Sequence, residues 1–310
     1  MKALVASPGA GVHVELADVD EPEPEPDHAV VDVKAASINR GEVRALQHAQ
    51  PGWRPGWDLA GVVAAAAVSG AGPREGSRVV GLVWSGAWSE RVSVPTQMLA
   101  HLPEAVSFEA AATLPVAGIT ARKAVEMAVV DGKRVAITGA AGGVGRFAVQ
   151  LAAQNGARVT AVVGRPERAD GLEALGAAEV VVGTLPTDGE PFALIIDSVG
   201  GDSLAAALGR VAPEGTVVTV GNSSGALTTF DVSSFYGKPG ARLCAFVVGA
   251  ELQRSHGATT DLGFLANLVA DGHLDVGIDR VVDWSDLGAV RAACTDLLGR
   301  RINGKAVLRL

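Results

Sequence analysis

A short apolar strand running into a glycine-rich turn is the feature that most constrains the fold of this chain. Residues 134–145 read Arg-Val-Ala-Ile-Thr-Gly-Ala-Ala-Gly-Gly-Val-Gly. Ala140, Gly142 and Gly145 occupy the three positions of the dinucleotide-binding fingerprint, with Ala in place of the first Gly. The missing side chain at 142 lets a pyrophosphate approach the backbone, and Gly145 lets the next helix pack on the strand. That helix, expected from 143 to about 154, points its free N–H groups at the phosphates.

The end of the next apolar strand, 157–163, indicates which dinucleotide is bound. Sites for the unphosphorylated cofactor carry Asp or Glu about 20 residues beyond the fingerprint, where it binds the ribose hydroxyls. This chain has Gly164 and Arg165 there, with Arg168 shortly after. Gly164 leaves room, and a guanidinium suits a phosphate dianion as a bidentate partner. The sequence therefore predicts NADPH, and the alternative is that both arginine side chains simply lie in water.

Composition limits the class of protein. The 310 residues suffice for two domains, and a hydrophobic content of 48 % allows a large core. The net charge of −8 argues against nucleic acid or an anionic membrane surface as the main partner. No apolar run reaches membrane-spanning length and no signal peptide is recognised, so the cytoplasm is the expected location. Cys244 and Cys294 lie in separate apolar segments, and we expect two buried thiols rather than a disulfide.

Two patterns follow one another along the chain. Up to about residue 100, short apolar runs punctuated by Gly and Pro predict a small β-barrel with one helix near 40–46. Beyond residue 134, strands alternate with helices, which predicts a doubly wound parallel sheet. The expected strands are 4–6, 12–16, 29–36, 61–67, 78–83, 89–94, 134–138, 157–163, 178–182, 193–198, 216–220, 242–248 and 306–310. The expected helices, after a Ser107-capped one and one at 118–127, are 143–154, 169–175, 203–211, 261–271 and 286–300.

Local signatures over nearly the whole chain occur in a definite order. They are Ala-Ala-Ser-Ile-Asn at 35–39, Pro-Gly-Trp-Asp-Leu-Ala-Gly-Val at 55–62, Gly-Ser-Arg-Val-Val-Gly at 76–81, the Phe-Glu-Ala-Ala-Ala-Thr-Leu-Pro segment from 108 to 121, the glycine turn, Asp-Ser-Val-Gly-Gly at 197–201, Val-Gly-Asn at 220–222 and Gly-Lys-Ala-Val-Leu at 304–308. Together they resemble the medium-chain dehydrogenase/reductase superfamily, most closely its zinc-free quinone oxidoreductase and enoyl reductase branch.

The resemblance implies an α/β protein of two domains. Residues 1–115 and 250–310 would form a GroES-like β-barrel catalytic domain, and residues 116–249 a Rossmann domain inserted into it. It also implies a homodimer, formed by edge pairing of the two sheets near 241–248.

Zinc-dependent relatives supply a Cys in the first of these segments and a His-Glu pair in the second. This chain has Asn39, Trp57 and Asp58 at the corresponding places. A zinc site needs three or four converging N, S or O ligands, which Asn and Trp do not supply. The six histidines are scattered along the chain. We therefore expect no metal, and we do not expect alcohol dehydrogenation, because nothing would polarise the alkoxide.

The resemblance also assigns roles in cofactor binding. Asn39 would face the nicotinamide ribose and the substrate, Thr120 would hydrogen-bond near the nicotinamide, and the residues at 246–248 would offer backbone groups to the carboxamide. The alternatives are a turn-forming Asn, an ordinary helix Thr and a core strand. The predicted cofactor-binding residues are Asn39, Thr120, Ala140, Gly142, Gly143, Val144, Gly164, Arg165, Arg168, Val199, Gly221, Asn222, Ser223, Phe246, Val247, Val248, Asn303 and Lys305.

Hydride transfer to a quinone or an activated C=C bond leaves an anion on a substrate oxygen, and a donor near that oxygen lowers the barrier. Many zinc-free relatives carry a Tyr five residues after the active-site Asn, whereas this chain has Arg44 there and its single tyrosine at Tyr236. Either Arg44 donates to the oxygen, or water supplies the proton and Arg44 is an exposed helix residue. Four of the five tryptophans lie at 53, 57, 84 and 88, which suggests a wall for a flat substrate or simply packing in the barrel.

The catalytic candidates are thus Asn39, Arg44 and Trp57. The expected activity is NADPH-dependent, zinc-independent reduction of a quinone or an α,β-unsaturated carbonyl. The alternatives are an enoyl reductase that tailors a secondary metabolite and an NADPH-binding sensor without turnover.

Overall fold

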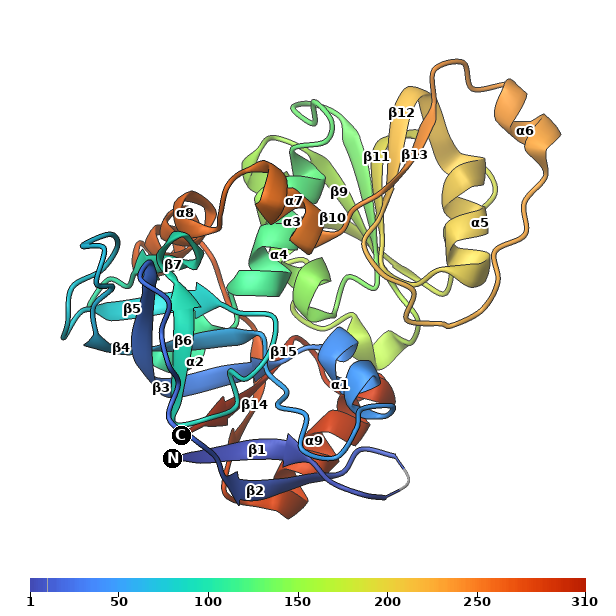
Figure 1. Cartoon of the computed structure of the whole chain (residues 1–310). Coiled ribbons are helices and arrows are strands. Elements are labelled where there is room, and N and C mark those ends of the chain that lie inside the picture. The colour runs from blue at the N-terminus through green and yellow to red at the C-terminus, as the bar shows by residue number, and fades with distance from the viewer. Residues whose placement is uncertain (10) are drawn as a thin grey trace. The chain divides into compact units, whose positions relative to one another are not determined.

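The computed structural model describes residues 1–9 and 11–310, which form two compact units (Figure 1). Unit 1 comprises Met1–Ile119 and Leu252–Leu310, and unit 2 comprises Thr120–Glu251. Unit 2 is thus inserted into unit 1 along the chain. The domain boundaries expected from the sequence lie after residues 115 and 249, a few residues earlier than the limits of these units.

Unit 1 is built mainly from strands. Its larger sheet has seven strands in the order β14-β15-β3-β4-β5-β7, with β6 paired to β3, and a separate ribbon joins β1 to β2. β14 and β15 are parallel, and the other pairs are antiparallel. The strands are β1 (Lys2–Ala6), β2 (Val14–Asp18), β3 (His28–Ile38), β4 (Asp58–Ala65), β5 (Arg78–Leu82), β6 (Arg91–Pro95), β7 (Leu99–His101), β14 (Ile278–Asp283) and β15 (Lys305–Arg309).

The register of three of these strands positions the polar residues discussed below. Ile38 of β3 pairs with Ala306 of β15, and Ala36 of β3 pairs with Leu59 of β4. The next residues along, Asn39, Lys305 and Asp58, therefore come together where the three strands meet. The helix α1 (Arg40–Leu46) starts directly after Asn39.

The tryptophans of unit 1 lie in different surroundings. Trp88 is completely buried in a core cluster with residues of α1, β15 and the helix α9 (Leu287–Leu298), and Trp53 packs against the same cluster. Trp84 is 49 % exposed. For Trp88 the alternative of packing in the barrel therefore holds, because the indole fills the apolar core and donates its N–H toward the carbonyl of Ser37.

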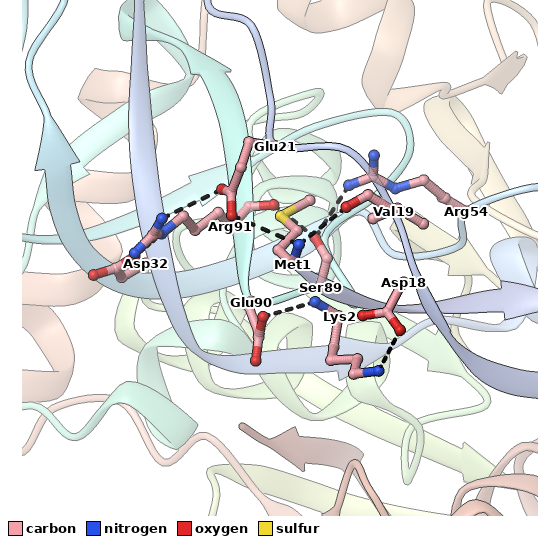
Figure 2. A network of polar contacts seen from close by, with 10 residues as sticks. All are labelled: Met1, Lys2, Asp18, Val19, Glu21, Asp32, Arg54, Ser89, Glu90 and Arg91. Atoms are coloured by element: carbon pink, nitrogen blue, oxygen red, sulfur yellow. Dashed lines mark hydrogen bonds and ion pairs between the residues drawn. The ribbon is translucent and has the colours of Figure 1, made fainter.

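A surface network ties the β1–β2 ribbon to the larger sheet (Figure 2). Arg91 Nε lies 2.8 Å from Asp32 Oδ1, and Arg91 Nη1 lies 3.3 Å from Glu21 Oε2. The backbone N–H of Lys2 donates to Glu90 Oε2 at 2.7 Å. Exposed pairs of this kind contribute about 0–1 kcal/mol each, so the network orients the ribbon more than it stabilises the fold.

Unit 2 contains a six-stranded parallel sheet in the order β10-β9-β8-β11-β12-β13. The predicted doubly wound parallel sheet is thereby confirmed. α4 (Gly143–Gln154) packs on β8 and β9, and α5 (Gly201–Arg210) covers β11 and β12 from the opposite face (Figure 1). The strands are β8 (Arg134–Thr138), β9 (Arg158–Val163), β10 (Ala177–Val182), β11 (Phe192–Asp197), β12 (Val211–Thr219) and β13 (Arg242–Ala245).

The bounds of the remaining helices agree only in part with those expected from the sequence. Ser107 caps α2 as expected, because its Oγ accepts the backbone N–H of Ala110 at 3.1 Å. The other helical elements are α2 (Phe108–Ala112), α3 (Pro115–Val125), α6 (Val232–Tyr236), α7 (Val248–Arg254), α8 (Thr259–Ala270), α9 (Leu287–Leu298) and the 3-10 turns η1 (Thr96–Met98) and η2 (Pro166–Arg168). None of the helices in the described parts of the chain is long and apolar enough to cross a bilayer.

Two expected elements of unit 2 are wrong. The helix expected at 169–175 is replaced by η2 and a series of turns, in which Gly171 and Gly176 adopt φ of +76° and +104° that a helix does not accommodate. The strand expected at 242–248 ends at Ala245, and Val248 already belongs to α7. Phe246, the next residue, still donates a backbone hydrogen bond to the carbonyl of Thr219 in β12, at 2.9 Å.

Candidate active site

Two glycines of the turn in unit 2, Gly142 and Gly145, are required for different reasons. A Cβ on Gly145 would lie 2.4 Å from the carbonyl oxygen of Gly139 and 2.6 Å from the Cα of Ala140. Gly145 is therefore required by the packing of α4 on β8. A Cβ on Gly142 would meet only the Gly139 oxygen, at 3.3 Å, and Gly142 is the N-cap of α4 at φ −83°. A side chain at Gly142 would thus be limited by one tight contact and not by several, so packing explains Gly142 less than it explains Gly145. The backbone of Gly142 lies at the start of a helix, where a pyrophosphate can approach closely.

The loop after β11 is fastened to this turn by a buried carboxylate. Asp197 accepts hydrogen bonds from Thr138 Oγ1 at 2.6 Å, Ser203 Oγ at 2.9 Å and the N–H of Gly200 at 2.8 Å. Ser198 Oγ in turn donates to the carbonyl of Thr138 at 3.0 Å. Sequence reasoning did not single out Thr138 or Asp197, although the Asp-Ser-Val-Gly-Gly signature directly after a strand pointed to this loop.

The loop after β12 joins the same edge of the sheet. Ser223 donates its N–H to the carbonyl of Ser198 at 3.1 Å, and Ser224 donates to the carbonyl of Val199 at 2.8 Å. Asn222 Oδ1 accepts the N–H of Gly225 at 3.0 Å, so this side chain closes its own turn. The structure thus brings together the predicted residues after β8, β11 and β12, at the carboxyl ends where such folds bind ligands.

The remaining predicted residues of unit 2 lie around that edge. Gly164 follows β9, and a Cβ there would meet nothing within 4 Å, so the open space is not needed by packing. Arg165 is exposed at the N-cap of η2, and Arg168 is half-buried at its end. Thr120 is buried in α3, and Val247 is 63 % exposed in the link between β13 and α7.

A buried polar cluster in unit 1 surrounds the predicted active-site asparagine. Asn39 Nδ2 donates to Asp58 Oδ2 at 2.8 Å, and Asn39 Oδ1 accepts from Lys305 Nζ at 2.7 Å. Asp58 also accepts from Ser37 Oγ at 2.7 Å and from the N–H of Val116 at 3.0 Å. Asn39 is 8 % exposed, Lys305 3 % and Asp58 0 %. The side chain of Lys305, predicted to bind cofactor, therefore contacts Asn39 and Asp58 directly.

Glu42 extends the cluster from the first turn of α1. Its Oε1 accepts the backbone N–H of Asn39, the backbone of Trp57 also lies close to the carboxyl group, and no hydrogen bond of normal geometry reaches the buried Oε2. Burial, reinforced by the nearby charge of Asp58, raises the pKa of Glu42 well above its ordinary value. Burial also lowers the pKa of Lys305, and the charges of Asp58 and Glu42 oppose that effect. Sequence reasoning missed Glu42, whose signal is its position three residues after an N-cap Asn.

The two other catalytic candidates belong to the same helix region. The indole of Trp57 lies over Gly41, where a Cβ would be 2.6 Å from Trp57 Cη2. Arg44 is exposed in the last turn of α1. Arg40 holds the helix in place by donating to the carbonyls of Leu297 and Leu298 at the end of α9.

The structure also offers one arrangement that the sequence did not indicate. Among the described residues, Glu25, Asp27 and His28 bring three possible metal-ligand atoms within 4.8 Å of one another. The two carboxylates are exposed, and His28 Nδ1 lies 3.0 Å from Ser93 Oγ. This group is distinct from the positions at which zinc-dependent relatives hold a metal.

Comparison with known proteins places the chain in a family. A family model described as zinc-binding dehydrogenase matches residues 143–261, and one described as alcohol dehydrogenase GroES-like domain matches residues 25–104. The chain is 30 % identical to the quinone oxidoreductase of Pseudomonas aeruginosa, over 72 % of this chain and 71 % of that protein. It is 36 % identical to the acrylyl-CoA reductase AcuI of Ruegeria pomeroyi, but that match spans only 60 % of either protein.

A solved structure agrees over the full length. The quinone oxidoreductase of Pseudomonas syringae superposes with a TM-score of 0.85 at 29 % identity, covering 100 % of this chain and 99 % of that one. The expected combination of a GroES-like domain and a Rossmann domain is therefore confirmed. The chain is an oxidoreductase that belongs to the medium-chain dehydrogenase/reductase superfamily, in its quinone oxidoreductase-like branch.

Proposed function

We propose that the protein is an NADPH-dependent, zinc-independent reductase that transfers hydride to a quinone or an α,β-unsaturated carbonyl. The observation that carries this proposal is the glycine turn, in which Gly142 is the N-cap of α4 and lies beside the loop held by Asp197. The relatives named as a quinone oxidoreductase and an acrylyl-CoA reductase support the two substrate classes.

The residues of unit 2 suit the phosphates of the cofactor. The N–H groups at the start of α4 would bind the pyrophosphate, and the loops held by Asp197 and Ser198 keep that edge of the sheet in place. Arg165 and Arg168 would bind the 2′-phosphate in the space that Gly164 leaves open. When bound, NADPH supplies the hydride.

The residues of unit 1 suit the substrate end of the reaction. Hydride addition leaves negative charge on a substrate oxygen, which a hydrogen-bond donor stabilises. Asn39 has a second Nδ2 hydrogen beyond the one it donates to Asp58. Arg44 is the other candidate donor, and Trp57 would provide an apolar contact for a flat substrate. In the alternative, water supplies the proton and Arg44 has no role in turnover.

We also propose that the protein is a homodimer in which β13 pairs with its copy. β13 is an edge strand of its sheet, and apolar side chains on it and just after it are exposed, with Leu243 at 47 % and Val247 at 63 %. The molar mass measured by light scattering should be that of a monomer for Leu243→Asp. For Val182→Asp, on the opposite edge strand β10, it should remain that of a dimer. A dimer in both variants would contradict pairing through β13.

The cytoplasm remains the expected location of the protein, and cell fractionation would test it.

Stopped-flow oxidation of bound NADPH, measured against a panel of quinones, enones and enoyl thioesters, tests the activity. Turnover of quinones or simple enones supports the main proposal, and turnover confined to enoyl thioesters favours the enoyl reductase alternative. Tight NADPH binding without reduction of any acceptor would overturn the reductase proposal in favour of a sensor.

A further inference from the structure

The carboxamide of Asn39 is held at both ends by opposite charges. Its oxygen faces the ammonium group of Lys305 at 2.7 Å, and its nitrogen faces the carboxylate of Asp58 at 2.8 Å. Rotating the carboxamide by half a turn would place its N–H groups against an ammonium and its oxygen against a carboxylate. Both new contacts would be repulsive in a buried environment, so the two charges select a single orientation.

The two charges lie in an apolar part of the sheet. Ala306, Val307 and Leu308, which follow Lys305 in β15, are all buried apolar residues. A buried ion pair usually stabilises a protein no better than apolar residues of the same size, because both charges lose their hydration. Stability alone therefore does not explain why Lys305 and Asp58 are buried in this sheet.

The surroundings restrict Asn39 further. Glu42 holds the backbone N–H of Asn39, and Ser37 and Val116 hold Asp58 from two other sides. The position of the Asp58 carboxylate is thus fixed by hydrogen bonds that do not involve Asn39. Of the two hydrogens on Asn39 Nδ2, Asp58 takes one, and the other is left for an acceptor outside the cluster.

We propose that Lys305 and Asp58 are positioning residues, which orient the Asn39 carboxamide so that its second N–H is presented to an oxygen of the bound substrate or cofactor. The inference rests on the proposed reductase function for the identity of that oxygen. It gives Asp58, at the place where zinc-dependent relatives hold a metal ligand, a purpose that needs no metal. Lys305 then acts through Asn39 and not on the cofactor itself.

The charge-neutral double variant Asp58→Asn/Lys305→Met separates positioning from stability. Each single change leaves the other charge buried and unpaired, so both single variants should unfold more easily than the wild type. The double variant removes both charges, and its unfolding midpoint should recover toward that of the wild type. Its kcat should nevertheless fall by about tenfold or more, with the KM for NADPH changed by less than about threefold, because only orientation is lost. A double variant with wild-type kcat would overturn the proposal.

A spectroscopic measurement tests the orientation without any substrate. The chain has five asparagines, so selective ¹⁵N-asparagine labelling gives few side-chain signals, and Asn39→Asp identifies the pair that belongs to Asn39. We expect slow hydrogen exchange at Asn39 Nδ2 in the wild type and at least tenfold faster exchange in the double variant. Equal exchange rates would contradict the proposal. This result is independent of whether the wild type reduces quinones or enones, so failure of the proposed function can be told apart from failure of this inference.

Arg309 provides the matched control. It lies on the same strand as Lys305 and pairs with Glu109 at 2.7 Å, but its side chain is 62 % exposed. Arg309→Met should leave both kcat and the exchange of the Asn39 carboxamide within about twofold of the wild type, because exposed ion pairs contribute little. A loss of kcat in Arg309→Met as large as that in the double variant would show that any ion pair of β15 matters, which would overturn a specific role for Lys305.

Discussion

The ammonium nitrogen of Lys305 lies 3.6 Å from a carboxylate oxygen of Asp58, and both side chains are buried in unit 1. The pair arises from strand register, since β3 is bordered by β15 on one side and β4 on the other. Unit 1 therefore holds an ammonium group inside the protein, at the end of the sheet where β15, β3 and β4 meet. The same cluster contains Glu42, which is buried close to the charge of Asp58.

Glu42→Gln should change how stability depends on pH. A raised pKa means that native Glu42 holds its proton more tightly than the unfolded chain does. The resulting stabilisation is fully present below the ordinary value of 4.5 and is lost as the pH rises toward the native pKa. Gln keeps the acceptor for the N–H of Asn39 and does not titrate, so the variant should match the wild type near pH 4.5 and exceed it at pH 8. Urea unfolding across this range measures the difference, and parallel curves for the two proteins would refute the assignment.

The two thiols should differ strongly in reactivity. Burial, with the nearby charge of Glu42, raises the pKa of Cys294 to about 12, and Cys244 is half-buried in β13. At pH 8 only about one Cys294 in ten thousand would be a thiolate, which is the reactive form. A disulfide reagent should therefore modify Cys244 in the native protein and reach Cys294 only after unfolding. The variant Cys244→Ser should show no native reaction, and rapid labelling of that variant would contradict the burial of Cys294.

The parallel sheet could be predicted because its signals are local. β8 and α4 begin and end where the apolar pattern and the glycine turn indicate. The helix expected at 169–175 failed because Gly171 and Gly176 adopt left-handed conformations that hydrophobic periodicity does not reveal. β14 escaped notice because it is partly exposed and has no continuous apolar run.

In the candidate site, too, local features could be predicted from the sequence and long-range contacts could not. The residues of the glycine turn lie next to one another in the sequence, so their pattern alone predicts their role. Asn39 and Lys305 are 266 positions apart, and only the pairing of β3 with β15 brings them together. The sequence named both residues by resemblance but could not show that they contact each other, and it had no signal for the burial of Glu42.

Two alanine variants of the glycine turn should fail for different reasons. In Gly145→Ala the new Cβ would meet backbone atoms of Gly139 and Ala140, which cannot easily move, so we expect a loss of about 1–3 kcal/mol in unfolding free energy. In Gly142→Ala the nearest atom is 3.3 Å away, and stability should change by no more than about 1 kcal/mol. NADPH affinity should nevertheless fall by about tenfold or more in Gly142→Ala, because the methyl group occupies the approach of the pyrophosphate. Urea unfolding and NADPH fluorescence titration measure the two effects. Unchanged affinity in Gly142→Ala would remove the main support for a dinucleotide at this turn.

Arg44→Ala should lower turnover without weakening NADPH binding. The side chain is exposed on α1 and could donate to the developing negative charge on a substrate oxygen. Losing one such donor typically lowers kcat by about 100-fold or more, so even a partial role would be measurable. Steady-state rates with the best acceptor of the panel, together with an NADPH titration, test this. An unchanged kcat would leave water as the proton source and Arg44 as a surface residue.

Arg165→Ala should discriminate between the two nicotinamide cofactors. Arg165 follows β9 at the edge where the dinucleotide is expected, next to the open space at Gly164. A charge-assisted hydrogen bond to a phosphate contributes about 1.5–3 kcal/mol, so the Kd for NADPH should rise by about 10–100-fold. NADH has no 2′-phosphate, and its Kd should change by less than about twofold by the same argument. Arg158→Ala, at the amino end of the same strand, is the matched control and should leave both affinities unchanged. If Arg165→Ala weakened NADPH and NADH equally, Arg165 would contact a part common to both cofactors, and the 2′-phosphate would have to be bound elsewhere.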